Sequence, residues 1–285
     1  MANAPARRDL GLLFDAVADD YLAVRPRYPD RLFDDLASIA ELGDAARVLE
    51  IGCGPGIATV PLLDRRWQVV AIEPGRSMAG LAAERGRGRP LRVEQSTFEE
   101  WAADGERFSL VFSATAFHWV DPAVRFEKAA AVLEDGGHLA LVTNRTVEGG
   151  GFARLYEASR NLHERHARDL ADEGPAPSAD ALIGALEGAA GDIGLLWAQA
   201  DPKGGVVPAG ELFEPPVLRT YRWEEAYRPA DAVRLLSTYS PYLALPAAER
   251  DALFAGIRRI IDERFDGVVT RPYLSVLAVA RRVSG

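Results

Sequence analysis

One short stretch, Val48–Gly56 (V-L-E-I-G-C-G-P-G), constrains the fold of this chain more strongly than any other. It opens on apolar residues around Glu50, and three glycines then follow at every second position, Gly52, Gly54 and Gly56. A Val/Leu/Ile run that meets a breaker at once predicts a short buried strand. The glycines predict a tight turn in which the backbone approaches a ligand, because a Cβ there would fill the space. The apolar residues that follow predict a helix, and this arrangement is typical of the nucleotide site in doubly wound α/β folds.

The same alternation of strand and helix continues along the chain. Apolar runs predict further strands at 67–73, 91–94, 108–114, 138–143, 217–223 and 271–280. Helical patterns occupy 29–39, 76–85, 122–133, 229–237 and 246–264. Strands separated by helices favour a parallel sheet with right-handed crossovers. We therefore expect an α/β protein with a Rossmann-like, doubly wound, mostly parallel seven-stranded sheet and helices on both of its faces.

Residues 135–137 predict a turn, which leads into the predicted strand at 138–143. The regular alternation of strands and helices stops after Asn144. Residues 149–210 begin with three glycines and continue with a predicted helix at 152–171, a Gly-Pro-Ala-Pro-Ser break and a second helical stretch. This composition predicts a mainly helical insertion, which we interpret as a substrate cap. Residues 1–148 would then form an N-terminal cofactor lid and the Rossmann-like core, and 211–285 the strands and helices that complete the core.

Charge and cysteine content exclude several classes of function. The net charge is −9, from 42 acidic and 33 basic residues, whereas binding to a nucleic-acid backbone needs clustered cations. A single cysteine cannot form an intramolecular disulfide. No apolar run reaches the ~18 residues of a membrane span, and the first residues lack the apolar stretch of a signal peptide. We expect a cytoplasmic protein, monomeric or homodimeric, that acts on a small molecule.

The register of the glycine turn distinguishes between nucleotide ligands. The dinucleotide fingerprint is G-x-G-x-x-G or G-x-G-x-x-A, and its third small residue allows close packing of helix on strand. Here that third position holds Ile57, which argues against NAD and FAD. The Gly-Lys-Ser/Thr sequence of a phosphate-binding P-loop is absent.

The segment Glu50–Gly56 resembles the E/D-x-G-x-G-x-G motif of class I S-adenosylmethionine-dependent methyltransferases. Glu73 ends the next predicted strand, at the spacing that this family uses for an acid on the ribose hydroxyls, and a carboxylate can accept hydrogen bonds from both hydroxyls. The alternative is a solvated acid at a strand end. A buried acid such as Glu50 is costly without a partner. The resemblance implies that the methionyl ammonium meets it, directly or through loop amides and water.

Two further segments extend the resemblance. The spacing of aromatic and basic residues over Phe14–Pro29 resembles the N-terminal segment of trans-aconitate and ubiquinone/menaquinone-type small-molecule methyltransferases, which folds over the cofactor. It implies that Tyr21, Arg25 and Tyr28 reach the methionyl end, with Arg25 pairing with its carboxylate; otherwise the tyrosines only anchor a helix. Phe117-His118-Trp119 resembles the segment after the fourth strand of that subgroup, near the methyl group.

The resemblance assigns the remaining site residues one by one. Beyond Tyr21, Arg25 and Tyr28, the implied cofactor contacts are Glu50, Gly52, Cys53, Gly54, Gly56, Glu73, Pro74, Ser77, Met78, Thr97, Phe98, Ala114 and Phe117. Met78 and Phe98 could equally be core residues. The candidates for binding the substrate are His118, Trp119, Tyr239 and Tyr242.

Methyl transfer from a sulfonium is an in-line displacement, so the protein mainly has to align the acceptor with the methyl–sulfur axis. A base is needed only if the acceptor loses a proton, and His118 is the candidate because its ordinary pKa suits that task. The other interpretations are a pocket wall and a structural histidine. His163 and His166 lie on a charged helix and are interpreted as a solvated face, so no metal site is expected.

These observations favour an enzyme that transfers a methyl group from S-adenosylmethionine to an oxygen, carbon or nitrogen of a small molecule. The acceptor could be a carboxylate or a secondary metabolite, and S-adenosylhomocysteine would be the second product. A non-catalytic, regulatory protein that binds the same cofactor is one alternative. An NAD(P)-dependent oxidoreductase is another, which Ile57 disfavours.

Overall fold

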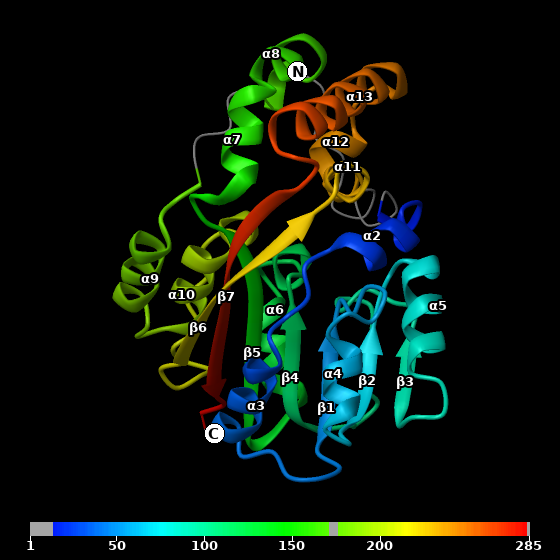
Figure 1. Ribbon diagram of the computed structural model, residues 1–285. Coiled ribbons are helices and arrows are strands. Elements are labelled where there is room, and N and C mark those ends of the chain that lie inside the picture. Colours follow the sequence, from blue (N-terminus) through cyan, green and yellow to red (C-terminus); the bar gives the residue numbers. More distant parts are fainter. Residues whose placement is uncertain (1–13, 171–175, 284–285) are drawn as a thin grey trace. The chain divides into compact units, whose positions relative to one another are not determined.

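The computed structural model describes residues 14–170 and 176–283, and it contains a seven-stranded sheet in the order β3-β2-β1-β4-β5-β7-β6 (Figure 1). The strands are β1 (Arg47–Ile51), β2 (Gln68–Ile72), β3 (Leu91–Glu94), β4 (Phe108–Ala114), β5 (Leu133–Thr146), β6 (Val217–Tyr227) and β7 (Val269–Arg281). Helices lie on both faces of this mostly parallel sheet, which confirms the predicted α/β class.

The strand pairing creates a point where the order of the strands reverses. β1 pairs in parallel with β2 and with β4, β2 pairs with β3, and β4 pairs with β5. The chain therefore runs outward from β1 to β3 and then returns to β4 on the other side of β1. Figure 1 shows that β7 points opposite to these strands. In doubly wound sheets ligands bind at such a reversal, outside the carboxyl ends of the strands.

By its contacts the chain divides into two compact units, each assembled from three segments. One unit comprises 27–145, 180–221 and 275–285 and holds most of the sheet. Its helices are α3 (Asp30–Ile39), α4 (Thr59–Asp64), α5 (Arg76–Arg85), α6 (Arg125–Val132), α9 (Ala179–Gly188) and α10 (Ile193–Ala200), with the short 3-10 helices η1 (Phe117–Trp119) and η3 (Pro202–Gly204). Its core joins Leu36 of α3 and Leu62 of α4 to Leu110 of β4, all fully buried. We call it the sheet unit.

The other unit comprises 1–26, 146–179 and 222–274, and we call it the helical unit. Its helices are α2 (Ala18–Val24), α7 (Gly150–Ala158), α8 (Arg160–His166), the 3-10 helix η2 (Arg168–Leu170), α11 (Pro229–Ser237), α12 (Ser240–Leu243) and α13 (Ala247–Arg264). Leu253, Ile257 and Ile261 of α13 repeat at helical spacing and bury one face in the core of this unit. Nowhere in residues 14–170 and 176–283 is a helix long and apolar enough to cross a membrane.

Two local predictions differ from the structure. The predicted turn at 135–137 belongs to β5 instead; the pairing of β4 with β5 shifts between Phe108 and Leu110, and Gly136 has a φ of +77°, so the extra residues form a bulge inside the strand. The predicted helix at 152–171 is two helices, α7 and α8, which meet at Ser159; residue 171 lies outside the described residues.

The predicted insertion at 149–210 is divided between the two units. Residues up to 179 belong to the helical unit, and residues from 180 onward belong to the sheet unit. The segment is mainly helical, with α7 to α10 and two short 3-10 helices. Its role as a substrate cap stays a prediction. Residues 1–13 of the predicted N-terminal lid lie outside the described part of the chain.

Candidate functional site

The glycine turn lies between β1 and α4, at the point where the strand order reverses. The backbone N–H groups of Gly52 and Cys53 both donate to the carbonyl of Ile72, at 2.8 and 3.2 Å, so the turn is tied to the end of β2. Gly52, Gly54 and Gly56 have φ values of +68°, +54° and +82°. L-residues rarely adopt this conformation, which explains the glycines.

The space around these three glycines differs from one to the next. A Cβ on Gly52 would lie under 3.0 Å from Ala116, a separation that real side chains essentially never show. A Cβ on Gly56 would lie 3.2 Å from the backbone of Ala82 in α5. A Cβ on Gly54 would meet nothing within 4 Å. Two of the glycines are therefore required by the packing of the protein itself, and only at Gly54 is there open space for a ligand.

Glu73 follows β2, and its carboxylate is bonded to the backbone around it. One oxygen accepts a hydrogen bond from the Gly54 N–H at 2.9 Å, and the other accepts one from the Gly75 N–H at 2.8 Å. Only 9% of the residue is exposed, so the interpretation as a solvated acid is wrong. Binding of a ribose through Glu73 stays a prediction.

Glu50 is a buried acid next to the glycine turn, and only 1% of it is exposed. Its Oε2 atom has no hydrogen-bond partner among the described residues. Burial raises the pKa of the carboxyl group to about 8; Thr59 partly opposes the rise, and the charge of Glu73 adds to it. A buried acid of this kind is suited to a cationic ligand group, because a nearby positive charge would stabilise its ionised form.

Replacing Glu50 with glutamine should make the ligand-free protein more stable, and increasingly so as the pH rises. The pKa near 8 lies above the ordinary 4.5, so between these values the folded state keeps a proton that the unfolded state has released. The stability of the wild type therefore falls as the pH rises through this window. Urea unfolding should show the difference between variant and wild type growing by a few kcal/mol between about pH 5 and about pH 8.5. A difference independent of pH would contradict this.

The residues of the N-terminal segment are divided between the two units. In the helical unit, Arg25 donates from Nε to Thr238 Oγ1 at 2.8 Å and from Nη2 to the Thr238 carbonyl at 2.5 Å, and its guanidinium lies 4.5 Å from the centre of the Tyr21 ring. In the sheet unit, the hydroxyl of Tyr28 is 2.9 Å from Thr115 Oγ1. The contacts of these residues with a cofactor stay predictions.

The Phe117–Trp119 segment forms η1 just beyond β4. The Phe117 ring is fully buried and packs edge-on against Phe126 at 5.3 Å and Trp197 at 6.3 Å between ring centres. The Phe117 side chain is therefore surrounded by other side chains of this protein. A contact between Phe117 and a ligand would involve its backbone.

His118 is paired with an acid that the sequence did not reveal. The Nδ1 atom of His118 lies 2.6 Å from Oδ2 of Asp201, and both side chains are buried, with 6% and 8% exposed. The ring of Trp119 lies 4.7 Å from that of His118. Asp201 follows α10, far along the chain, in a stretch without a motif. No sequence signal could have connected it to His118.

The segment that carries Asp201 is fixed against η1. Arg125 of α6 is completely buried and donates from Nη1 and Nη2 to the carbonyls of Gly204 and Gly205, at 2.9 and 3.1 Å. A Cβ on Gly204 would lie 3.1 Å from the Cβ of His118, so the backbone of η3 touches the histidine. The position of Asp201 next to His118 therefore follows from buried hydrogen bonds and close packing.

The predicted adenosine contacts lie in the sheet unit, and several are buried. Met78 of α5 is buried, as is Phe98, which stacks on Trp101 with 6.4 Å between ring centres. Thr97 Oγ1 accepts a hydrogen bond from the Glu100 N–H at 3.2 Å. Contact of these residues with adenosine stays a prediction.

The other predicted cofactor residues lie at or just beyond the carboxyl ends of β1, β2 and β4. Cys53 is buried inside the glycine turn, where burial raises the pKa of its thiol, so it packs as a small neutral side chain. Pro74 follows Glu73, Ser77 lies in the first turn of α5, and Ala114 is the last residue of β4. Their contact with a cofactor also stays a prediction.

One interpretation of the α8 histidines is wrong. His163 is 1% exposed, and its Nε2 lies 3.1 Å from the hydroxyl of Tyr242, while Nδ1 lies 3.1 Å from the Ser159 carbonyl. The charged residues next to His163 in the sequence suggested an exposed helix, whereas the His163 side chain contacts Tyr242 of α12. Tyr242 is thus engaged inside the helical unit, and its role in binding a substrate, like that of Tyr239, stays a prediction.

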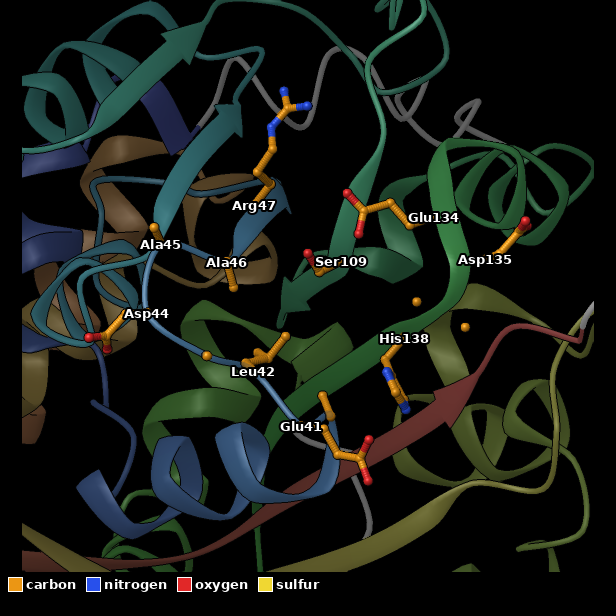
Figure 2. Close-up of a pocket in the computed structure, with 14 residues that line it drawn as sticks. Glu41, Leu42, Asp44, Ala45, Ala46, Arg47, Ser109, Glu134, Asp135 and His138 are labelled. Atoms are coloured by element: carbon orange, nitrogen blue, oxygen red, sulfur yellow. The ribbon is translucent and has the colours of Figure 1, made fainter.

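A cavity of about 270 Å³ opens at the amino ends of the strands, at the opposite end of the sheet from the glycine turn (Figure 2). Its lining includes the loop at 40–47, which leads into β1, and the bulged residues 134–138 of β5. Glu41, Asp44, Glu134 and His138 are among its side chains in Figure 2. The cavity therefore lies at the amino ends of β1 and β4, away from the edge at which doubly wound folds bind ligands.

Comparison with known proteins agrees with this geometry. Residues 48–137 match the model of the methyltransferase domain family, and the match begins in β1 and includes the glycine turn, Glu73 and η1. This part of the chain is a methyltransferase domain. Among residues 14–170 and 176–283, no group of three or more His, Cys, Asp or Glu side chains could hold a metal beside it.

Curated relatives of the methyltransferase domain are similar over part of their length. An uncharacterized methyltransferase of Mycobacterium tuberculosis (strain ATCC 25618 / H37Rv) is 37% identical over 150 residues, 52% of this chain and 59% of that protein. A trans-aconitate 2-methyltransferase of Variovorax paradoxus is 33% identical over 42% of this chain and 48% of its own. A ubiquinone biosynthesis O-methyltransferase of Rhizobium rhizogenes is 29% identical over 39% and 46%. This chain thus spans about half to three fifths of these relatives.

Solved structures share the fold of the methyltransferase domain and its surroundings. A structure described as a type II methyltransferase from Anaeromyxobacter dehalogenans has a TM-score of 0.58 and 21% identity, and covers 90% of this chain and 97% of its own. The [4+2]-cyclase SpnF has a TM-score of 0.51 and 16% identity, and covers 99% and 98%. Since a cyclase has this fold too, the fold alone does not define the reaction.

Proposed function

We propose that this protein transfers the methyl group of S-adenosylmethionine to a small-molecule acceptor. The observation that carries the proposal is the buried carboxyl of Glu50 beside the glycine turn, whose Oε2 atom has no hydrogen-bond partner among the described residues. The ammonium of S-adenosylmethionine would favour the ionised form of Glu50 and pair with it, whereas the pyrophosphate of a dinucleotide would offer this acid no positive charge. Ile57 at the third small position also disfavours a dinucleotide.

The residues divide the tasks of binding and orientation. Glu50 and the turn from Gly52 to Gly56 would hold the methionyl end. The carboxylate of Glu73 would accept hydrogen bonds from the ribose hydroxyls. Bound S-adenosylmethionine supplies an electrophilic methyl group on a sulfonium. The chain's part is to place the acceptor in line with that methyl group and exclude water, and such orientation can contribute about 7–11 kcal/mol.

His118 would take the proton that an acidic acceptor group releases. Its Nδ1 faces Asp201 at 2.6 Å, which leaves Nε2 for the acceptor. A carboxylate against one ring nitrogen helps to fix the orientation of the ring. Asp201 is therefore proposed as a positioning residue that acts through His118.

The names of the relatives support a small-molecule acceptor. One is called a trans-aconitate 2-methyltransferase and another a ubiquinone biosynthesis O-methyltransferase, and the second of these names gives oxygen as the atom that is methylated. The net charge of −9 also favours a small molecule over a nucleic acid.

Calorimetry with S-adenosylmethionine, S-adenosylhomocysteine and NAD tests the cofactor. We expect the first two to bind and NAD not to bind, and Glu50→Gln should weaken S-adenosylhomocysteine by about tenfold because a charged partner is lost. Binding of NAD alone would contradict the proposal. Transfer of a labelled methyl group into a metabolite extract then separates an enzyme from a regulatory protein, because only the enzyme labels a product.

A further inference from the structure

In the helical unit, two arginines face the ring of Tyr239. The guanidinium carbon of Arg25 lies 4.2 Å from the ring centre, and that of Arg271 on β7 lies 5.4 Å from it. Arg271 also lies 4.9 Å from the centre of the Phe152 ring and 5.7 Å from that of Tyr273. An aromatic cluster thus surrounds two positive charges.

Within the described parts of the chain, no carboxylate lies within 4.0 Å of Arg25 or Arg271, although paired arginines are common elsewhere in the molecule. Arg25 donates to Thr238, and Arg271 donates from Nε and Nη2 to a single oxygen, Thr146 Oγ1, at 3.1 and 2.9 Å. Their described partners are hydroxyls, a carbonyl and aromatic rings, which stabilise a cation but carry no negative charge, so an anion would bind favourably here.

Arg271 has donors to spare, and part of it is exposed. A guanidinium carries five N–H groups, whereas the hydrogen bonds of Arg271 to described residues use one from Nε and one from Nη2. Tyr273 is buried, its hydroxyl is 3.2 Å from that of Tyr227, and its ring stacks on Trp223 with 4.9 Å between ring centres. Tyr239, in contrast, is only partly buried. The cluster therefore offers a planar cation beside a partly exposed aromatic ring.

We propose that Arg271 binds a carboxylate of the methyl acceptor, whose flat, unsaturated or aromatic body lies against the partly exposed ring of Tyr239. A carboxylate fits because the planar guanidinium can donate to both of its oxygens in parallel. This inference rests on the proposed methyl transfer only in naming the ligand as the acceptor. The site itself consists of residues of the helical unit.

The test compares matched ligands that differ only in charge. Binding of cinnamate and of its neutral amide, cinnamamide, is measured by calorimetry in the presence of saturating S-adenosylhomocysteine and again without it. The wild type should prefer cinnamate by about tenfold or more, Arg271→Met should lose this preference, and Arg271→Lys should keep a part because an ammonium is a cation without the planar fork. Arg234→Gln is the control, because Arg234 lies in the same unit but is already paired with Asp20.

The outcomes separate this site from the cofactor site. Equal affinity of the wild type for cinnamate and cinnamamide overturns the proposal. The proposal is also overturned if the Arg271→Met variant binds cinnamate normally but no longer binds S-adenosylhomocysteine, because Arg271 would then hold the cofactor. If the wild type fails to bind S-adenosylhomocysteine yet prefers cinnamate through Arg271, the proposed methyl transfer fails and the anion site stands. If Arg271→Met does not fold, judged by circular dichroism, the lysine variant decides.

Discussion

Replacing Gly52 with alanine should lower the affinity for S-adenosylmethionine and S-adenosylhomocysteine at least about a hundredfold, which is about 2.7 kcal/mol. Its Cβ would lie under 3.0 Å from Ala116, and the residue has a φ of +68°. Relief of the clash must move the glycine turn away from the loop that leads into η1, while the left-handed conformation costs alanine roughly 1–2 kcal/mol. Calorimetry on the purified variant measures the effect.

Gly88 provides the matched control for this substitution. It has a φ of +77°, similar to that of Gly52, but a Cβ there would meet nothing within 4 Å. Gly88→Ala should therefore lose only the roughly 1–2 kcal/mol of stability that this conformation costs alanine, and it should bind the cofactor as the wild type does. If Gly52→Ala also binds normally, the turn does not hold the cofactor.

Replacing Asp201 with asparagine should reduce kcat by about 10- to 100-fold, and replacing His118 with glutamine by about a hundredfold or more. The asparagine keeps the shape of Asp201 but removes the charge that faces His118 Nδ1 at 2.6 Å. Because Asp201 acts through His118, the double variant should be no slower than His118→Gln alone. Single-turnover rates with saturating S-adenosylmethionine measure this coupling.

A purely structural role for Asp201 would give a different result. The asparagine variant would then lose thermal stability, and its loss of kcat would be as large in the His118→Gln background as in the wild type. The positioning role instead predicts that the variant keeps its thermal stability and that the loss of kcat is absent in the His118→Gln background. Full turnover of His118→Gln would show that His118 only lines the pocket.

The sheet could be predicted because each strand carries its own signal. Apolar runs that end at a glycine or at an acid followed by proline define β1 and β2, another apolar run defines β4, and the helices between the strands favour a parallel sheet. The bulge in β5 could not be predicted, because Asp135-Gly136-Gly137 is also a good turn sequence. Pairing with β4, not local preference, decides its structure.

The site could be predicted only where its residues lie close to the glycine turn in the sequence. Glu50 and Glu73 end neighbouring strands, so their place at one edge of the sheet follows from the topology. Asp201 and Arg271 belong to segments with no motif, and only the tertiary structure brings one to His118 and the other to Tyr239. His163 shows the same limit, because a charged neighbourhood did not reveal which side of α8 faces Tyr242.

The division of the chain into interleaved segments affects how the protein can be cut. Each unit is assembled from three separate stretches, and β5, β6 and β7 each begin in one unit and end in the other. No single proteolytic cleavage can therefore release either unit intact, and a fragment ending after the family match at residue 137 would lack β5 beyond its bulge, β6 and β7. Such a fragment would keep every glycine of the turn, but its sheet would be incomplete and β4 would be an uncovered edge strand. An uncovered edge strand can pair with another chain, so the fragment is expected to aggregate.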